Sequence, residues 1–166
     1  MTPYLIALWF YAVMASLVFG ATVYETLVVH PAWSRNPPES FAGFVLPASR
    51  MNIPVFWIPV AQGYLLGGIA AVALSFRAGV LSTPLIVSGA CAVITVGWTI
   101  LYFRPRVAGF LGVGGVPTPP DRLPSAVRQW IALNWIRAAL VVVSWIGVAL
   151  ALATGRGSLT VEAFVN

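Results

Sequence analysis

Residues 130–153 read WIALNWIRAALVVVSWIGVALALA, an almost wholly apolar run with a single charge at Arg137. A helix needs about 20 apolar residues to cross the hydrocarbon core of a bilayer. Comparable stretches lie at residues 4–29, 53–76 and 84–103, and the last run extends back to residue 127. The chain is 60% hydrophobic and 8% charged, with a mean hydropathy of +0.92, too apolar for a water-soluble surface. We predict an all-α integral membrane four-helix bundle that forms one domain over residues 1–166, with helices at about 4–29, 53–76, 84–103 and 127–153.

The apolar runs lack the alternation of polar and apolar residues that a transmembrane barrel needs, which favours helices. The first run has no basic leader and is longer than a secretory signal core, so we expect it to stay in the mature protein. Cys91 is the only cysteine, which excludes an internal disulfide and a cysteine-based metal site.

The connections predict two long loops on one side of the membrane, at residues 31–50 and 104–125, and a short turn on the other side. All nine basic residues are arginines, and most of them lie in or beside the long loops. The positive-inside rule therefore predicts that residues 31–50 (loop 1) and 104–125 (loop 3) are cytoplasmic. Arginines recruited to a binding site would give the same bias. The net charge of +5 comes without dense basic clusters, so no nucleic-acid partner is expected.

Two charges inside the predicted spans, Glu25 and Arg137, are the first candidates for a functional site, because a charge in hydrocarbon costs several kcal/mol unless it is compensated. Both lie within about 10 Å of the helix ends that face the long loops. They could form a structural ion pair. Alternatively, Glu25 could stay protonated in a pocket of low dielectric and act as an acid or base.

Other polar residues of the spans are expected in the same half of the bundle. Helix periodicity predicts inward-facing stripes on the third and fourth helices. The expected members of this polar half are Asn52, Gln62, Thr95, Thr99, Tyr102, Arg104 and Asn134. The stripe on the third helix is Ser88, Ala92, Thr95, Thr99 and Tyr102. The stripe on the fourth helix is Trp130, Asn134, Arg137, Val141 and Ser144. Small residues at Ala12, Ser16 and Gly20, and at Gly63, Gly67 and Ala71, predict close helix packing.

His30 is the only histidine and a candidate general base. Because Pro31 disfavours helix at the preceding residue, we expect His30 at the frayed end of the first helix. A metal is not expected, because there is no second histidine, and Glu25 would project from a different side of the helix. Two alternatives stay open for His30: it could be an axial ligand of haem, or it could be an interfacial histidine without a functional role. Trp33 and Trp130 adjoin these residues and could stack on a flat aromatic ligand.

These residues carry a family resemblance. The segments Gly20-Ala21-Thr22-Val23-Tyr24-Glu25, His30-Pro31-Ala32-Trp33, Pro37-Pro38-Glu39, Asn52-Ile53-Pro54 and Trp130-Ile131-Ala132-Leu133-Asn134-Trp135-Ile136-Arg137 occur in that order. Over the whole chain they resemble the anthrone-oxygenase-like family of small four-helix membrane proteins.

The resemblance implies a monooxygenase-type oxidoreductase that oxidises a hydrophobic polycyclic phenol with O2 and needs no separate flavin or metal. His30 or Glu25 would remove a proton. Arg137, with Asn134 and Tyr102, would stabilise the enolate. Trp33 and Trp130 would hold the rings, and Asn52 and Arg104 are further substrate-binding candidates.

Two other functions stay open on the residues alone. One is a non-catalytic membrane subunit or lipid/quinone-binding protein, with membrane lipid, a homo-oligomer or a larger membrane complex as partner. The other is a small transporter, which the lack of an internal repeat and of paired broken helices disfavours.

Overall fold

The computed structural model describes residues 2–43, 53–112 and 116–165, and in these ranges the regular structure is helical, with no strand. The first membrane segment begins with α1 (Pro3–Tyr24), continues through a π-helical turn, η1 (Glu25–Val29), and ends with α2 (His30–Trp33). A short 3-10 helix, η2 (Glu39–Gly43), follows in loop 1. The first segment is therefore longer than the predicted helix and includes His30.

The second segment is α3 (Ile53–Arg77). The third consists of α4 (Thr83–Trp98), a second π-helical turn, η3 (Thr99–Phe103), and α5 (Arg104–Leu111). The fourth is α6 (Leu123–Val165). In the described part of the chain, four helical segments are long and apolar enough to cross a membrane, as expected for a multi-pass membrane protein.

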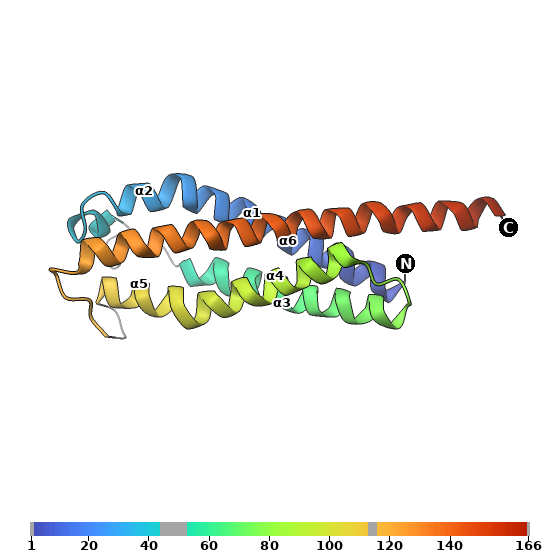
Figure 1. Cartoon of the computed structure of the whole chain (residues 1–166), viewed down its shortest axis with the longest axis horizontal. Helices are drawn as coiled ribbons and strands as arrows, with labels where there is room; N and C mark the ends of the chain where they lie inside the picture. Colours follow the sequence, from blue (N-terminus) through green and yellow to red (C-terminus); the bar gives the residue numbers. More distant parts are fainter. Residues whose placement is uncertain (1, 44–52, 113–115, 166) are drawn as a thin grey trace.

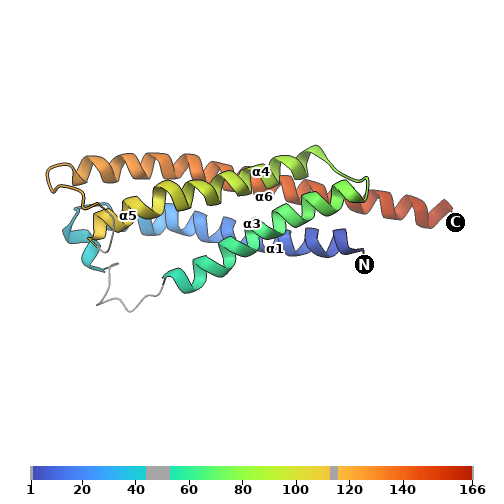
Figure 2. The same ribbon diagram turned by 90° about the horizontal axis from the view of Figure 1, so that it is seen from below.

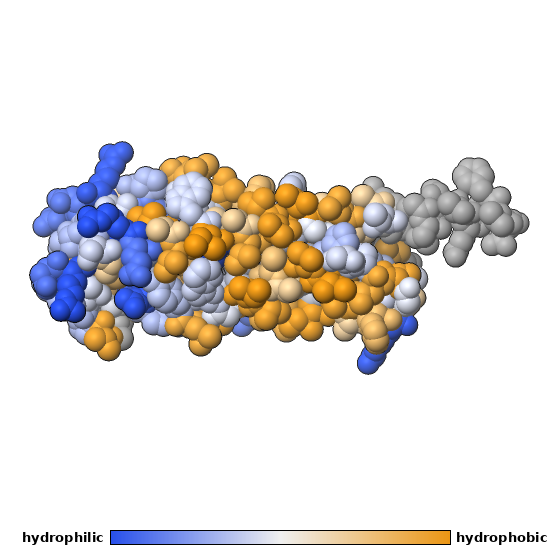
Figure 3. All heavy atoms as spheres, in the orientation of Figure 1, coloured by the Kyte–Doolittle hydropathy of each residue, from blue (hydrophilic) through white to orange (hydrophobic). Residues whose placement is uncertain are grey.

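The four segments form an elongated bundle (Figures 1 and 2). α1 packs against α3 and α6, and α4 packs against the same two helices, so α1 and α4 lie diagonally across the bundle. Both ends of the chain lie at the right of Figure 1, and the described parts of loops 1 and 3 lie together at the left. Figure 3 shows hydrophilic residues gathered at this loop end and a hydrophobic surface along most of the helices.

Each π-helical turn ends two residues before a proline, and the intervening residue forms the pair His30-Pro31 or Arg104-Pro105. The amide of His30 donates to the carbonyl of Glu25, and that of Arg104 donates to Thr99, five residues back in both cases. Proline lacks an N–H group and its ring clashes with the carbonyl four residues earlier. The wider turn lets the helix continue past this clash, so the expectation of a frayed helix end at His30 is wrong.

The extra residue of a π-helical turn rotates the face of the helix that follows it. On the third segment the stripe at Ser88, Ala92 and Thr95 is buried as predicted. At the end of η3 the inward residue is Phe103, and Tyr102 is only half-buried. The prediction that Tyr102 continues the buried stripe is therefore wrong. The fourth segment has no such turn, and the whole predicted stripe, from Trp130 to Ser144, is buried.

The small residues of α3 pack closely, as predicted. A Cβ atom on Gly67 would lie 3.3 Å from the Cα atom of Tyr11, and one on Gly63 would lie 2.8 Å from the sulfur of Met14. On α1 the prediction is confirmed for Ala12, which is buried, and wrong for Ser16 and Gly20, which are exposed. The stripe that α1 buries contains Leu8, Tyr11, Ala12, Ala15, Val18 and Thr22.

Candidate functional site

The centre of the site is the guanidinium group of Arg137, which is 8% exposed inside the loop-end half of the bundle. Its Nε donates to Oδ1 of Asn134 over 2.9 Å, and one terminal nitrogen donates to the hydroxyl of Thr99 over 3.4 Å. The group also lies over the ring of Phe103, 5.2 Å from the centroid. An arginine carries five N–H groups. Three of them have no hydrogen-bond partner within the described ranges.

Asn134 links Arg137 to the first segment by hydrogen bonds. Its Oδ1 accepts from Arg137, which can only donate, so its Nδ2 must face the other way. Nδ2 lies 3.0 Å from Nδ1 of His30 and 3.4 Å from the hydroxyl of Thr26. Nδ1 of His30 therefore accepts, and the proton of the neutral ring lies on Nε2. In this arrangement Nδ1 of His30 accepts from Asn134 and Nε2 carries the ring proton, so neither nitrogen is free to remove a proton from a substrate.

Aromatic rings enclose the loop side of this hydrogen-bond chain. The His30 ring meets Trp130 edge-on at 4.9 Å and Trp33 at 6.0 Å between centroids. Trp130 also contacts Phe103 at 5.4 Å, and its indole N–H donates to the Phe103 carbonyl. The structure thus brings together His30, Trp33, Trp130, Asn134 and Arg137 from the first and fourth segments, as the sequence predicts.

Glu25 lies on a different side of the first segment. Its carboxylate accepts a hydrogen bond of 2.8 Å from the indole N–H of Trp57 on α3. Glu25 and Arg137 interact electrostatically, but they form no ion pair with an N–O distance of 4.0 Å or less. The two charges therefore influence each other without a direct ion pair.

Several residues predicted for the site lie elsewhere. Arg104 and Gln62 are exposed, and Tyr102 contacts Trp98 and Arg106 instead of Arg137. Asn52 lies outside the described residues. The register change at η3 explains why Tyr102 and Arg104 lie away from the site, because it turns both residues away from the helix face that includes Thr95.

Three participants were not expected from the sequence: Thr26, Trp57 and Phe103. The structure also forms a second polar cluster around Tyr11, in which only Ser88 and Ser144 lie on the predicted stripes. The hydroxyl of Tyr11 is 2.7 Å from that of Ser88 and 3.0 Å from that of Ser144, and the Tyr11 ring stacks on Tyr64 at 5.7 Å. All four residues of this cluster are buried in the half of the bundle away from the long loops. A signal for Tyr11 was present, because it lies one turn from Leu8 and Ala15 on the buried stripe of α1.

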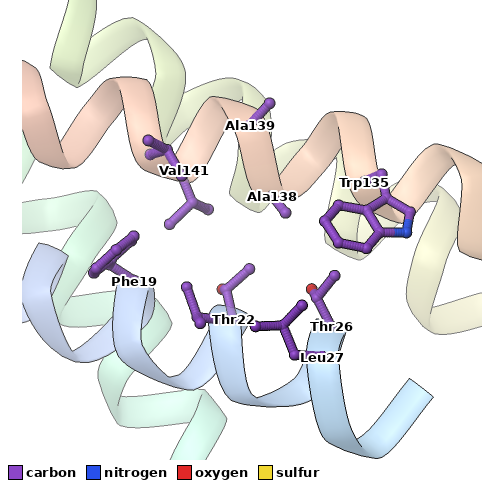
Figure 4. Close-up of a pocket in the computed structure, with 10 residues that line it drawn as sticks. Phe19, Thr22, Thr26, Leu27, Trp135, Ala138, Ala139 and Val141 are labelled. Atoms are coloured by element: carbon purple, nitrogen blue, oxygen red, sulfur yellow. The ribbon is translucent and has the colours of Figure 1, made fainter. Parts of the chain in front are cut away.

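A membrane-facing groove adjoins the site. It has a volume of about 260 Å³ and lies between α1, η1 and α6, where Thr22 and Thr26 point toward Ala138 and Val141 (Figure 4). Its walls are almost entirely apolar. Thr26 both lines the groove and bonds Asn134, so the groove lies directly beside the hydrogen-bond chain.

The hydrogen bond of His30 differs from that of a typical metal-binding histidine. No cluster of three histidine, cysteine, aspartate or glutamate side chains occurs in the part of the chain that the structure describes. A histidine that binds a metal almost always donates its other ring N–H to a partner. Here Nδ1 of His30 accepts from Asn134 instead. Ligation through Nε2 would therefore require a change in the proton position of His30.

Comparisons of the chain with protein-family models, with curated proteins and with solved structures found no match.

Proposed function

We propose that this chain is a membrane-embedded enzyme, similar to anthrone oxygenases, that oxidises a hydrophobic polycyclic phenol or a related small molecule with O2. The observation that carries the proposal is the environment of Arg137. Its guanidinium is buried, its direct partners are neutral, and three of its N–H groups have no partner in the described structure. A buried cation with free donors is suited to a ligand oxygen that becomes negative.

This arrangement gives a role to a charge that would otherwise be costly. An uncompensated arginine inside a bilayer costs at least about 2.5 kcal/mol. A phenolate or enolate oxygen beside Arg137 would offset that cost. Donors fixed before the reaction stabilise such an oxygen most when its charge develops in the transition state. Asn134 holds Nε in place, so the guanidinium is oriented before a substrate binds.

Glu25 is the base that the geometry favours. Its carboxylate is oriented by the Trp57 indole and lies near Arg137 without pairing with it. A substrate whose oxygen faces Arg137 would present an acidic C–H group toward Glu25. His30 is favoured as a positioning residue, because its Nδ1 already accepts from Asn134.

The proposed reaction balances without a further reductant. Glu25 removes a proton from the ring CH₂ group, and the electron pair of that C–H bond passes into the enolate. The enolate reduces O2 and forms a C–O bond at the same carbon. Loss of the second hydrogen and cleavage of the O–O bond then give a ketone and water, so one oxygen atom enters the product and the other leaves as water.

Enzyme assays on the purified full chain in lipid nanodiscs test this proposal. The substrate would be an anthrone, and the readouts would be O2 uptake and the absorbance of the quinone product. Arg137→Gln should lower the rate by roughly a hundredfold to a thousandfold. Glu25→Gln should lower it by at least roughly a hundredfold. Arg104→Gln is the matched control, because Arg104 is exposed, and it should leave the rate within about twofold.

Two results would contradict the proposal. If a folded Arg137→Gln protein oxidises the anthrone as fast as wild type, Arg137 does not stabilise the reacting oxygen. If Glu25→Gln is fully active and His30→Ala is inactive although folded, the base would be His30, and Nδ1 of His30 would not be the acceptor of the Asn134 amide.

A non-catalytic lipid/quinone-binding protein or membrane subunit is the second candidate function. It is favoured by the groove that Thr26 connects to Asn134, since an apolar ligand could lie there without turnover. This candidate predicts a bound ligand and no O2 uptake in the same assay. For both functions we propose that loops 1 and 3 face the cytoplasm, because most of the arginines lie at that end.

A further inference from the structure

The groove between α1, η1 and α6 opens toward the lipid. Leu27, Trp135 and Val142, which line it, are 60%, 52% and 37% exposed. From Trp135 to Val142 it runs about 10 Å along α6. One leaflet of the hydrocarbon core is about 15 Å deep. The groove therefore has the length of part of an acyl chain.

A positive charge lies in line with this groove. On α6, Arg128, Trp135 and Val142 follow one another at steps of seven residues, which is close to two full turns and keeps them on one face. Arg128 is exposed and lies about 10 Å from Trp135, toward the loop end. Among the described residues it makes no ion pair and no side-chain hydrogen bond.

Arg128 is one of a group of exposed arginines at the loop end, which we call the collar. Its described members are Arg35, Arg104, Arg106, Arg122 and Arg128. The acids of the same end that the structure describes are Glu39 and Asp121, and only Asp121 forms an ion pair, with Arg122 at 3.8 Å. Figure 3 shows this end as the hydrophilic cap of a hydrophobic body. The collar thus has an excess of positive charge where phosphate groups of lipids lie.

We propose that this face binds an anionic phospholipid, with one acyl chain in the groove and its phosphate at Arg128. Two independent features select this ligand. The groove is apolar and lies at the depth of hydrocarbon, which a free phosphate ion would not require. Arg128, which lies in line with the groove along α6, could pair with an anionic headgroup, whereas a neutral quinone carries no such group. The proposal stands whether or not the Arg137 site is catalytic, because none of its residues is assigned to the reaction.

Quenching by brominated lipids tests the proposal on the full chain in nanodiscs. Trp135 lies in the groove, so the difference in fluorescence between wild type and Trp135→Phe isolates its signal from the other tryptophans. Brominated phosphatidylglycerol should quench this signal more strongly than brominated phosphatidylcholine. Arg128→Gln should reduce the preference about fivefold, which corresponds to about 1 kcal/mol for one arginine near the surface.

Two control variants sharpen the test. Arg77→Gln removes an exposed arginine at the opposite end and should leave the preference unchanged. Ala138→Phe fills the groove while keeping Arg128, because Ala138 points into the groove in Figure 4, and it should weaken quenching by both lipids. Circular dichroism would confirm that each variant is folded.

Three results would overturn the proposal. Equal quenching by the two lipids would show that the charge of the headgroup is not recognised. Competition by millimolar glycerol phosphate would show a free phosphate site instead of a lipid site. Displacement of the lipid by a short-chain quinone in both wild type and Arg128→Gln would assign the groove to a neutral ligand.

Discussion

Replacing Asn134 with leucine should destabilise the protein by about 2 to 4 kcal/mol. Asn134 accepts from Arg137 Nε at 2.9 Å and faces His30 at 3.0 Å and Thr26 at 3.4 Å. Losing a hydrogen bond to a charged group costs about 1.5 to 3 kcal/mol. Each interhelical bond inside a membrane contributes about 0.6 kcal/mol on average. Leucine has a similar volume, so the cost reflects the lost bonds rather than a cavity.

The assay is reversible unfolding in mixed micelles, in which the fraction of sodium dodecyl sulfate is raised and helicity is followed by circular dichroism. Gln62→Leu is the matched control, because Gln62 is exposed and lacks such partners, and it should change stability by less than about 0.5 kcal/mol. An equally small effect for Asn134→Leu would refute the reasoning, since it would mean that the chain from Arg137 to His30 does not form in the folded protein.

The packing and hydrogen bonds give three further predictions. Because His30 is the only histidine, nitrogen NMR of histidine-labelled protein should show one neutral ring with its proton on Nε2; a proton on Nδ1 would mean that His30 donates to Asn134 instead of accepting from it. Tyr11→Phe should lower the free energy of unfolding by about 1 to 2 kcal/mol in the micelle assay, because it removes a buried hydroxyl with two hydrogen-bond partners. Tyr24→Phe at an exposed site should leave stability unchanged. Equal effects of the two variants would show that the hydrogen bonds of Tyr11 do not stabilise the bundle. Gly147→Ala should cost about 1 to 3 kcal/mol, because its Cβ would lie 2.6 Å from a carbonyl oxygen of α4, and Gly20→Ala, with open space around it, should not destabilise; a silent Gly147→Ala would show that these helices pack less closely.

The membrane fold could be predicted because it depends on the length and composition of four runs, which local sequence shows directly. The stripe on α6 was also predictable, because an undisturbed helix keeps one face over many turns. Trp130, Asn134 and Arg137 are buried together for this reason.

The wrong predictions for Tyr102 and His30 both arise at the π-helical turns. Each turn adds a residue to the helix, so the pattern behind it shifts to another face. Phe103 takes the inward place expected for Tyr102, and His30 is buried in a continuing helix where a frayed end was expected. The prolines at positions 31 and 105 were the visible signal, but sequence alone does not say whether a helix stops at a proline or widens before it.

The contacts across the bundle were the least predictable part. Whether Glu25 meets Arg137 or Trp57 depends on which face of α3 turns toward the first segment, and α3 has apolar residues on all sides. The Tyr11 cluster depends in the same way on the diagonal placement of α1 and α4. Such pairings are set by the packing of whole helices and leave no local pattern.

The most direct test of the proposed oxygenase activity is turnover of an anthrone by the purified protein under heavy-isotope O2, analysed by mass spectrometry. We predict a quinone in which one oxygen atom comes from O2, formed by wild type and lost in a folded Arg137→Gln variant. Absence of the label from the product, or the same labelled product at the same rate from both proteins, would contradict the proposed activity.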